Sequence, residues 1–194
     1  MTDVSSPDAP ETPDRRVPAS PSRGSADAPP DRDELIACVE LLFFAYRDFT
    51  GDADAVLEEY GFGRAHHRVL HFVARNPGLT VAELLDILRI TKQSLARVLK
   101  QLVSESFVMQ RAGAVDRRER RLYLTAKGTR LADKLTSLQI KRIEAALDAA
   151  GPDASGATRR FLFAMIADGD RPQVEALIRL PGDPIAHPAG RDGP

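Results

Sequence analysis

The sequence is short of the residues that several common classes of protein need. It contains one cysteine, Cys38, and no tryptophan, and aromatic residues make up 6% of the 194. One cysteine excludes an internal disulfide and a four-cysteine zinc site. Leucine, alanine, valine and isoleucine are plentiful instead, which favours a mainly helical fold over a β-sandwich.

Signals for membranes and for catalysis are missing as well. No apolar run approaches the roughly 20 residues that cross a bilayer, and residues 1–8 lack the basic and apolar regions of a secretory signal. We therefore expect a cytoplasmic protein with no membrane partner. The sequence has no paired catalytic carboxylates, no nucleophile-base arrangement and no phosphate-binding glycine loop. An enzyme is not expected, nor is a cofactor.

Both ends of the chain differ in composition from the middle. Residues 1–31 hold seven of the fourteen prolines, and their sizeable apolar residues are Met1, Val4 and Val17. Such a segment cannot offset the entropy cost of ordering, so we expect it to be disordered. Residues 169–194 form a C-terminal tail with room for one short helix. The intervening residues 32–168 are predicted to form one domain.

Positive charge is concentrated between residues 89 and 130. This stretch carries eleven lysines or arginines against three acidic residues, a balance of +8, whereas the whole chain sums to −1. Charge gathered in this way is typical of a surface that follows a phosphate backbone. The alternative, an exposed hairpin whose arginines are merely solvated, would not require such a concentration of one sign.

Three helical patterns are found in residues 33–75, before the basic stretch. Residues 33–50 predict a helix, with Asp31 or Asp33 as its cap, that is apolar on nearly every face. A small domain cannot cover such a helix, so we predict a homodimer with this helix at its interface. A short helix capped by Asp52 is expected within residues 51–63, and a second amphipathic helix over 64–75.

Residues 80–104 predict a helix-turn-helix. Thr80 and Glu83 form a capping box for a helix over 81–88, and Ile90-Thr91 begins the next helix after a short turn. In that second helix, one face is apolar and is expected to be buried: Leu95, Val98, Leu99 and Leu102. The opposite face is polar and contains Lys92, Gln93, Ser94, Arg97, Lys100 and Gln101.

Residues 107–124 predict a β-hairpin with a charged tip, or wing. Strand-like runs at 107–111 and 121–124 flank the arginine-rich segment. Thr125 then caps a long helix that ends at Gly151-Pro152, and Asp153 or Ser155 begins a further helix. The two helices fall within residues 126–168.

The order of these elements resembles the MarR family of winged helix-turn-helix transcriptional regulators. The most specific part is Asp116-Arg117-Arg118, followed by Leu124-Thr125-Ala126-Lys127-Gly128. The resemblance implies a mainly α (α+β) fold in which a winged helix-turn-helix domain binds DNA. It also implies that the N- and C-terminal helices, 33–50 and 126–168, form a dimerisation domain.

The residue types suggest how such a protein would contact double-stranded DNA. Gln93 and Arg97 can read base edges in the major groove. Backbone contacts are expected from Thr91, Lys92, Ser94 and Lys100. The resemblance implies that Arg118 enters the minor groove and that Asp116 orients it, with Arg117, Arg120 and Arg121 adding phosphate contacts. A dimer predicts a pseudo-palindromic operator.

Three residues are candidates for sensing a signal. Regulators of the resembled family commonly respond to a small ligand, which implies a repressor with a small-molecule effector. Some relatives sense peroxide through a cysteine on the first helix, but the apolar neighbours of Cys38 favour a buried hydrophobe. His67 and His71, at i and i+4, could share a zinc ion, line a ligand pocket or serve as core or interface histidines, and we favour a core or interface role.

One alternative function stays open, and one residue departs from the pattern of the resembled family. A winged-helix module that binds proteins without specific DNA binding would show the same fold, and only the preference for a cognate duplex separates the two. Ala96 also stands where the resembled family frequently has a polar residue that faces the groove.

Overall fold

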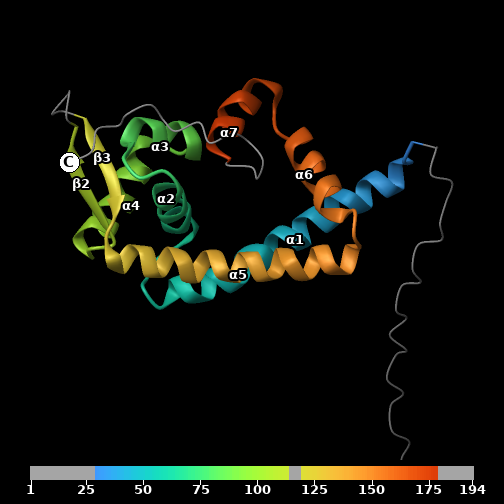
Figure 1. Cartoon of the computed structure of the whole chain (residues 1–194), viewed down its shortest axis with the longest axis horizontal. Coiled ribbons are helices and arrows are strands. Elements are labelled where there is room, and N and C mark those ends of the chain that lie inside the picture. The colour runs from blue at the N-terminus through green and yellow to red at the C-terminus, as the bar shows by residue number, and fades with distance from the viewer. Residues whose placement is uncertain (1–28, 114–118, 179–194) are drawn as a thin grey trace, which may run out of the picture. The chain divides into compact units, whose positions relative to one another are not determined.

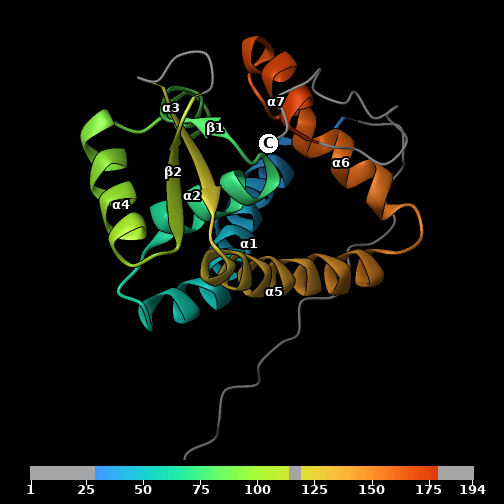
Figure 2. The ribbon, with the colours of Figure 1, turned by 60° about the vertical axis from the view of Figure 1, so that its left-hand side comes forward.

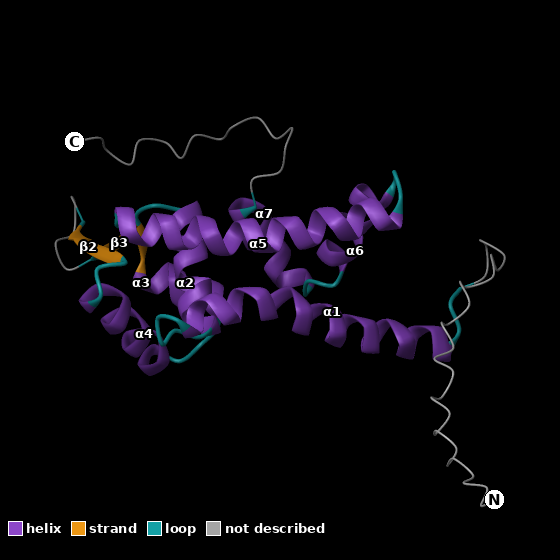
Figure 3. Ribbon diagram, turned by 90° about the horizontal axis from the view of Figure 1, so that it is seen from below, coloured by secondary structure: helices purple, strands orange, loops and turns teal. Residues whose placement is uncertain are grey.

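A computed structural model describes residues 29–113 and 119–178 of the chain (Figure 1). Most of the described residues are helical, and the strands are confined to one small sheet (Figure 3). The elements in order are α1 (Arg32–Glu58), α2 (Arg64–Arg75), β1 (Leu79–Thr80), α3 (Val81–Leu88), α4 (Lys92–Ser104), β2 (Val108–Ala112), β3 (Arg120–Leu124), α5 (Ala126–Ala150), α6 (Ala154–Ala164), the 3-10 turn η1 (Asp168–Asp170) and α7 (Arg171–Leu177).

The chain divides into two compact units, residues 1–41 and 42–194. The described part of the first unit is the beginning of α1, which exposes Leu35, Ile36, Val39 and Leu41. The second unit contains the remainder of α1 and every later element. The division falls inside α1, whose buried residues are Thr50, Ala53 and Leu57.

Helix α1 is longer than predicted. It continues through Gly51 to Glu58, so the separate short helix expected in residues 51–63 is wrong. Ala53 and Leu57 are fully buried in the core, and the Thr50 hydroxyl donates to the carbonyl of Tyr46 at 3.0 Å. This burial outweighs the roughly 1 kcal/mol that a glycine costs inside a helix.

The helix-turn-helix has the boundaries that its capping residues predict. The Thr80 hydroxyl accepts from the Glu83 amide at 3.2 Å, while the Glu83 carboxylate accepts from the Thr80 amide at 2.8 Å. Helix α3 ends at Leu88 and is followed by the C-cap Arg89, which has a left-handed backbone with φ of 49°. Thr91 then caps α4 by accepting from the Ser94 amide at 3.1 Å. These local bonds satisfy amides that the helix itself leaves without partners.

The wing is part of a three-stranded antiparallel sheet with the order β1-β3-β2 (Figure 2). Val108 lies opposite Leu124, and Ala112 opposite Arg120. The strands of the hairpin begin and end within one residue of the predicted runs. Strand β1 was not predicted, because two residues carry no alternating pattern. The predicted tip, residues 114–118, lies outside the described residues.

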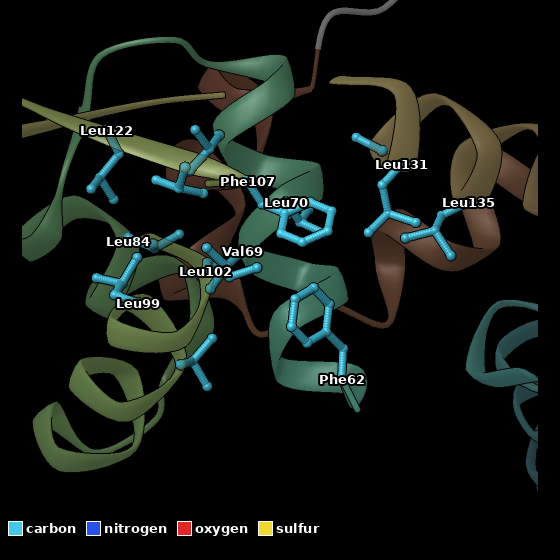
Figure 4. Close-up of a cluster of buried hydrophobic side chains, with 14 of the residues drawn as sticks. Phe62, Val69, Leu70, Leu84, Leu99, Leu102, Phe107, Leu122, Leu131 and Leu135 are labelled. Carbon is cyan, nitrogen blue, oxygen red and sulfur yellow. The ribbon is translucent and has the colours of Figure 1, made fainter. Parts of the chain in front are cut away.

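One hydrophobic core joins the sheet to α2, α3, α4 and the start of α5 (Figure 4). Phe107 lies near its centre with an exposure of 1%, and its ring makes an edge contact with Phe62 at a centroid distance of 5.1 Å. Leu131 and Leu135 bring α5 onto this core. The core therefore fixes how the hairpin and α4 lie relative to α5.

Helix α5 begins at a close backbone contact. Gly128 is buried in the first turn, and a Cβ atom placed there would lie 2.0 Å from the carbonyl oxygen of Phe107. The same carbonyl accepts from the Thr125 amide at 3.0 Å. Only glycine allows α5 to approach the hairpin this closely.

The helices after α5 were predicted from the sequence. Helix α6 begins after Asp153, one of the two candidate caps, although the Asp153 side chain makes no capping hydrogen bond. The one short helix expected in the tail is present as α7, preceded by η1. Arg171 ties this segment together by donating to the carbonyls of Ala164 and Ile166 at 2.8 and 3.1 Å.

Replacing Gly128 with alanine is expected to destabilise the protein. The added methyl group must displace the Phe107 carbonyl, and overpacking of this kind costs about 1–3 kcal/mol. The matched control is Gly51→Ala, because nothing lies within 4 Å of a Cβ atom at Gly51. That change should stabilise α1 by up to about 1 kcal/mol. Urea unfolding at one fixed protein concentration measures both, and equal midpoints for the two variants would contradict the close contact.

Candidate nucleic-acid interface

Helix α4 separates its residues cleanly into two faces. The four residues of the predicted apolar stripe are all buried, with exposures of 0% to 4%: Leu95, Val98, Leu99 and Leu102. The predicted contact residues on the other face are exposed, apart from Ser94, which is half-buried: Thr91, Lys92, Gln93, Arg97 and Lys100. The core thus holds α4 by one side and leaves three cations and one amide in solvent.

The first turn of α4 combines capping with exposure. The Thr91 hydroxyl accepts from the Ser94 amide and donates to the Ser94 hydroxyl at 2.9 Å. The two hydroxyls predicted to contact a DNA backbone are therefore engaged with each other, and they fix the start of the helix. The helix N-terminus itself favours a nearby phosphate.

Ala96 interrupts the polar face. It is exposed, and it lies among Lys92, Gln93, Arg97 and Lys100 on the helix surface. A methyl group in this setting can contact a thymine methyl but cannot form a hydrogen bond with a base. Its exposure agrees with the groove-facing position that the resemblance to the MarR family implies for it.

The hairpin carries one exposed arginine and one arginine that forms an ion pair. Arg120 is exposed at the start of β3. The guanidinium of Arg121 forms an ion pair with Glu119 at 2.8 Å, so its charge is partly balanced within the protein. The residues predicted to enter or approach the minor groove, Asp116, Arg117 and Arg118, lie outside the described residues.

Arg111 was not among the residues predicted to contact DNA. This side chain is exposed on β2, opposite Arg121, and its guanidinium lies 5.1 Å from the centre of the Tyr123 ring. The contact with the ring holds this cation on the face of the hairpin that also carries Arg121. Burial falls along β2 from Val108 to the exposed Gln110, Arg111 and Ala112. The signal that could have identified Arg111 is its charge at the end of the predicted run 107–111.

Cys38 is exposed in the single chain, so the expectation of a buried hydrophobe is not met. Apolar neighbours in the sequence suggested burial, but these neighbours are themselves exposed: Leu35, Val39, Leu41 and Leu42. An apolar pattern indicates that a helix face packs against another apolar surface. It does not show whether that surface belongs to the same chain.

The histidines of α2 are held in partly or fully buried positions. His67 is 9% exposed, and burial lowers its pKa, to which the charge of His71 adds. Burial likewise lowers the pKa of His71, with a further contribution from Arg75. Among the described residues, no three histidine, cysteine or acidic side chains are grouped so that they could hold a metal ion.

The third histidine of this helix reaches α4. His66 lies 3.0 Å from the amide oxygen of Gln101 through Nε2. The sequence gave no reason to separate His66 from its neighbours, because the contact depends on how α2 and α4 pack. Gln101 itself is half-buried, at the edge of the exposed face.

Within residues 29–113 and 119–178, no helix is long and apolar enough to cross a membrane.

Comparisons with known proteins agree with this geometry. A profile of the MarR family matches residues 60–119. The HTH-type transcriptional regulator PetP of Rhodobacter capsulatus is 46% identical over 145 residues, which cover 75% of this chain and 87% of PetP.

Solved structures show the same fold. A MarR transcriptional regulator from Methanosarcina mazei superposes with a TM-score of 0.58 at 25% identity, covering 71% of this chain and 96% of the other. A mutant MarR from E. coli, complexed with operator DNA, gives a TM-score of 0.56 at 19% identity over 71% of this chain and 100% of the other.

The helix-turn-helix, the basic hairpin and the extent of the match to PetP lead to one conclusion. The chain is a winged helix-turn-helix transcriptional regulator that belongs to the MarR family.

Proposed function

We propose that the protein is a homodimeric, sequence-specific DNA-binding repressor that acts in the cytoplasm and is released from its operator by a small ligand. The observation that carries the proposal is the exposed face of α4, where Lys92, Gln93, Arg97 and Lys100 project away from a fully buried stripe. The structure of a mutant MarR with operator DNA supports a DNA target for this face.

In this proposal, α4 lies in the major groove and the hairpin lies along the adjacent minor groove. Gln93 and Arg97 read base edges, and Lys92, Lys100, Thr91 and the half-buried Ser94 contact the backbone. Arg111 and Arg120 approach phosphates from the strands of the hairpin. Arg118, oriented by Asp116 and flanked by Arg117, inserts at its tip.

The proposal of a dimer rests on apolar side chains that are exposed in the described part of the chain. Phe43, Phe44 and Tyr46 of α1 are each more than half exposed, as are Phe161 and Met165 of α6. Exposed apolar patches of this kind mark association surfaces. A two-fold axis would place the two copies of α4 on half-sites about one turn of duplex apart.

A thiol-based regulator is the second candidate, because Cys38 is exposed in the single chain. In a dimer held by α1, the same side chain would be covered by the partner. The accessibility of Cys38 thus reports on both the dimer and the redox alternative.

Arg97→Ala is expected to remove sequence discrimination. An arginine that reads guanine contributes about 1–3 kcal/mol, so affinity for a duplex selected by the wild-type protein should fall about 10- to 100-fold. Affinity for a random duplex should fall much less. Arg159→Ala, which removes one exposed charge from α6, is the control. Fluorescence anisotropy at fixed salt measures both, and equal losses on the two duplexes would exclude base reading by Arg97.

Arg118→Ala is expected to weaken binding to most operators and to lower the salt dependence. The slope of log affinity against log salt should decrease by about one phosphate contact. Arg160→Ala on α6 provides a matched loss of charge away from the hairpin. An unchanged slope would contradict the assignment of the wing to the minor groove.

Phe43→Glu is expected to raise the dissociation constant of the dimer, because a charge would enter an apolar interface. Phe43 is 69% exposed, so the change leaves the core of one chain intact. Val103→Glu, at an exposed apolar position on α4, is the control for oligomeric state. Sedimentation velocity gives the state of each variant, and the rate of Cys38 alkylation should increase as the dimer dissociates.

An unchanged dimer in Phe43→Glu would contradict the interface. Release of operator by mild peroxide with Cys38 oxidised in the intact dimer would favour the thiol-based candidate over the ligand-based one.

A further inference from the structure

A short chain of hydrogen bonds connects the start of α2 to the second half of α4. The Gly63 amide lies 3.1 Å from His66 Nδ1, and His66 Nε2 lies 3.0 Å from Gln101 Oε1. Gln101 Nε2 then donates to the Glu105 carboxylate at 3.0 Å. The chain is partly buried where α2 packs against α4.

The donors and acceptors along this chain are mutually consistent. A backbone N–H can only donate, so Nδ1 of His66 must be the acceptor and Nε2 must carry the proton. Nε2–H therefore donates to the amide oxygen of Gln101, which leaves the amide NH₂ to donate to Glu105. One tautomer of neutral His66 satisfies every partner.

The surroundings of His66 favour this neutral form. Burial lowers the pKa of His66, opposed by its hydrogen bonds to Gln101 and to the Gly63 backbone. From α4, the carboxylate of Glu105 raises this pKa and the guanidinium of Arg97 lowers it. On α5, Lys127 adds a cation beyond Glu105. The imidazole thus remains a neutral donor and acceptor near neutral pH.

The ring of His66 is fixed by the aromatic core. It stacks on Phe62 at a centroid distance of 4.7 Å and an interplanar angle of 4°. Phe62 is 6% exposed and contacts Phe107 and Tyr60. Because this packing restricts the ring of His66, its Nε2–H donor keeps a fixed position. The hydrogen bond can therefore hold the amide oxygen of Gln101 in place.

The C-terminal end of α4 is held from a second direction. Lys127 Nζ, at the start of α5, donates to the Glu105 carbonyl at 3.0 Å and lies 4.0 Å from the centre of the Phe107 ring. Helix α4 is therefore held by polar contacts from α2 and α5, in addition to its buried stripe.

We infer that His66 and Gln101 are positioning residues that fix the rotation of α4 about its own axis and so align Arg97 with the bases. This inference rests on the proposed function of α4 as the reader of the major groove. Arg97 lies four residues before Gln101, one turn along the same side of the helix.

The size of the effect follows from helix geometry. Side chains extend to a radius of about 5–6 Å, so a rotation of about 10° moves their ends by roughly 1 Å. Good hydrogen bonds span a range of only about 0.5 Å in donor-acceptor distance. An apolar stripe, whose contacts are not directional, tolerates such a rotation more easily than base recognition does.

The first test is Gln101→Met in the full-length protein. Methionine is similar in length but cannot accept from His66. Affinity for a duplex selected by the wild-type protein should fall about fivefold to tenfold, the factor that one net hydrogen bond supplies. Affinity for a random duplex should stay within about twofold, because phosphate contacts tolerate a small rotation. Gln173→Met, at an exposed position on α7, is the matched control.

The second test is His66→Gln, alone and combined with Gln101→Met. A glutamine at the third position of a helix can still accept from the Gly63 amide, so the start of α2 is preserved while the link to Gln101 is lost. If the two residues act as one link, the double variant should lose no more selectivity than either single variant. This variant also decides the matter if Gln101→Met does not fold.

The expected results are selective loss on the selected duplex and non-additivity in the double variant. Equal losses on both duplexes, or additive losses, would overturn the inference while leaving the proposed function intact. A wild-type protein with no sequence preference would overturn both. Independently of DNA, ¹⁵N NMR of the free protein should show His66 with its proton on Nε2, and a proton on Nδ1 would overturn the hydrogen-bond chain.

Discussion

The burial of one face of α4 is the constraint on which the rest of the structure depends. Leu95, Val98, Leu99 and Leu102 leave water almost completely, and four such side chains contribute roughly 6–12 kcal/mol. The net stability of a domain is of the same size, about 5–15 kcal/mol. The helix cannot turn over without unfolding the core, so its polar face must remain in solvent.

Elements whose signals are local were predictable from the sequence. Helices α2, α3 and α4 have caps or stop signals next to an apolar period, and Thr80 and Thr91 bind the amides expected of them. The two hairpin strands followed from strand-like runs on either side of a charged segment. At these positions, propensity, pattern and capping all favour the same structure.

Features that depend on distant contacts were not predictable. Gly51 reads as the end of a helix, but the burial of Ala53 and Leu57 carries α1 past it. Strand β1 exists because its partner β3 lies beside it. Cys38 was expected to be buried, but it and its apolar neighbours are exposed in the part of the chain that the structure describes. Each case turns on what packs against the residue, which a sequence pattern does not contain.

In the candidate interface, too, some features were predictable from the sequence and others were not. The composition of the α4 face was readable from helical periodicity, because exposure follows from the buried stripe on the other side. The role of His66 was not, since His66, His67 and His71 look alike in the sequence and differ only in what they face. His66 meets Gln101, whereas burial dominates at His67 and His71.

Helix α5 physically connects the proposed dimer interface to the proposed DNA-binding elements. At its start, Gly128 packs on the Phe107 carbonyl and Lys127 holds the end of α4. Farther along, Ile140 and Ile143 are exposed where a partner would pack. The helix has 25 residues, a length of about 37 Å at about 1.5 Å per residue. A tilt of this one rigid element at the dimer face would move the hairpin and α4 together, so a ligand bound there need not touch either.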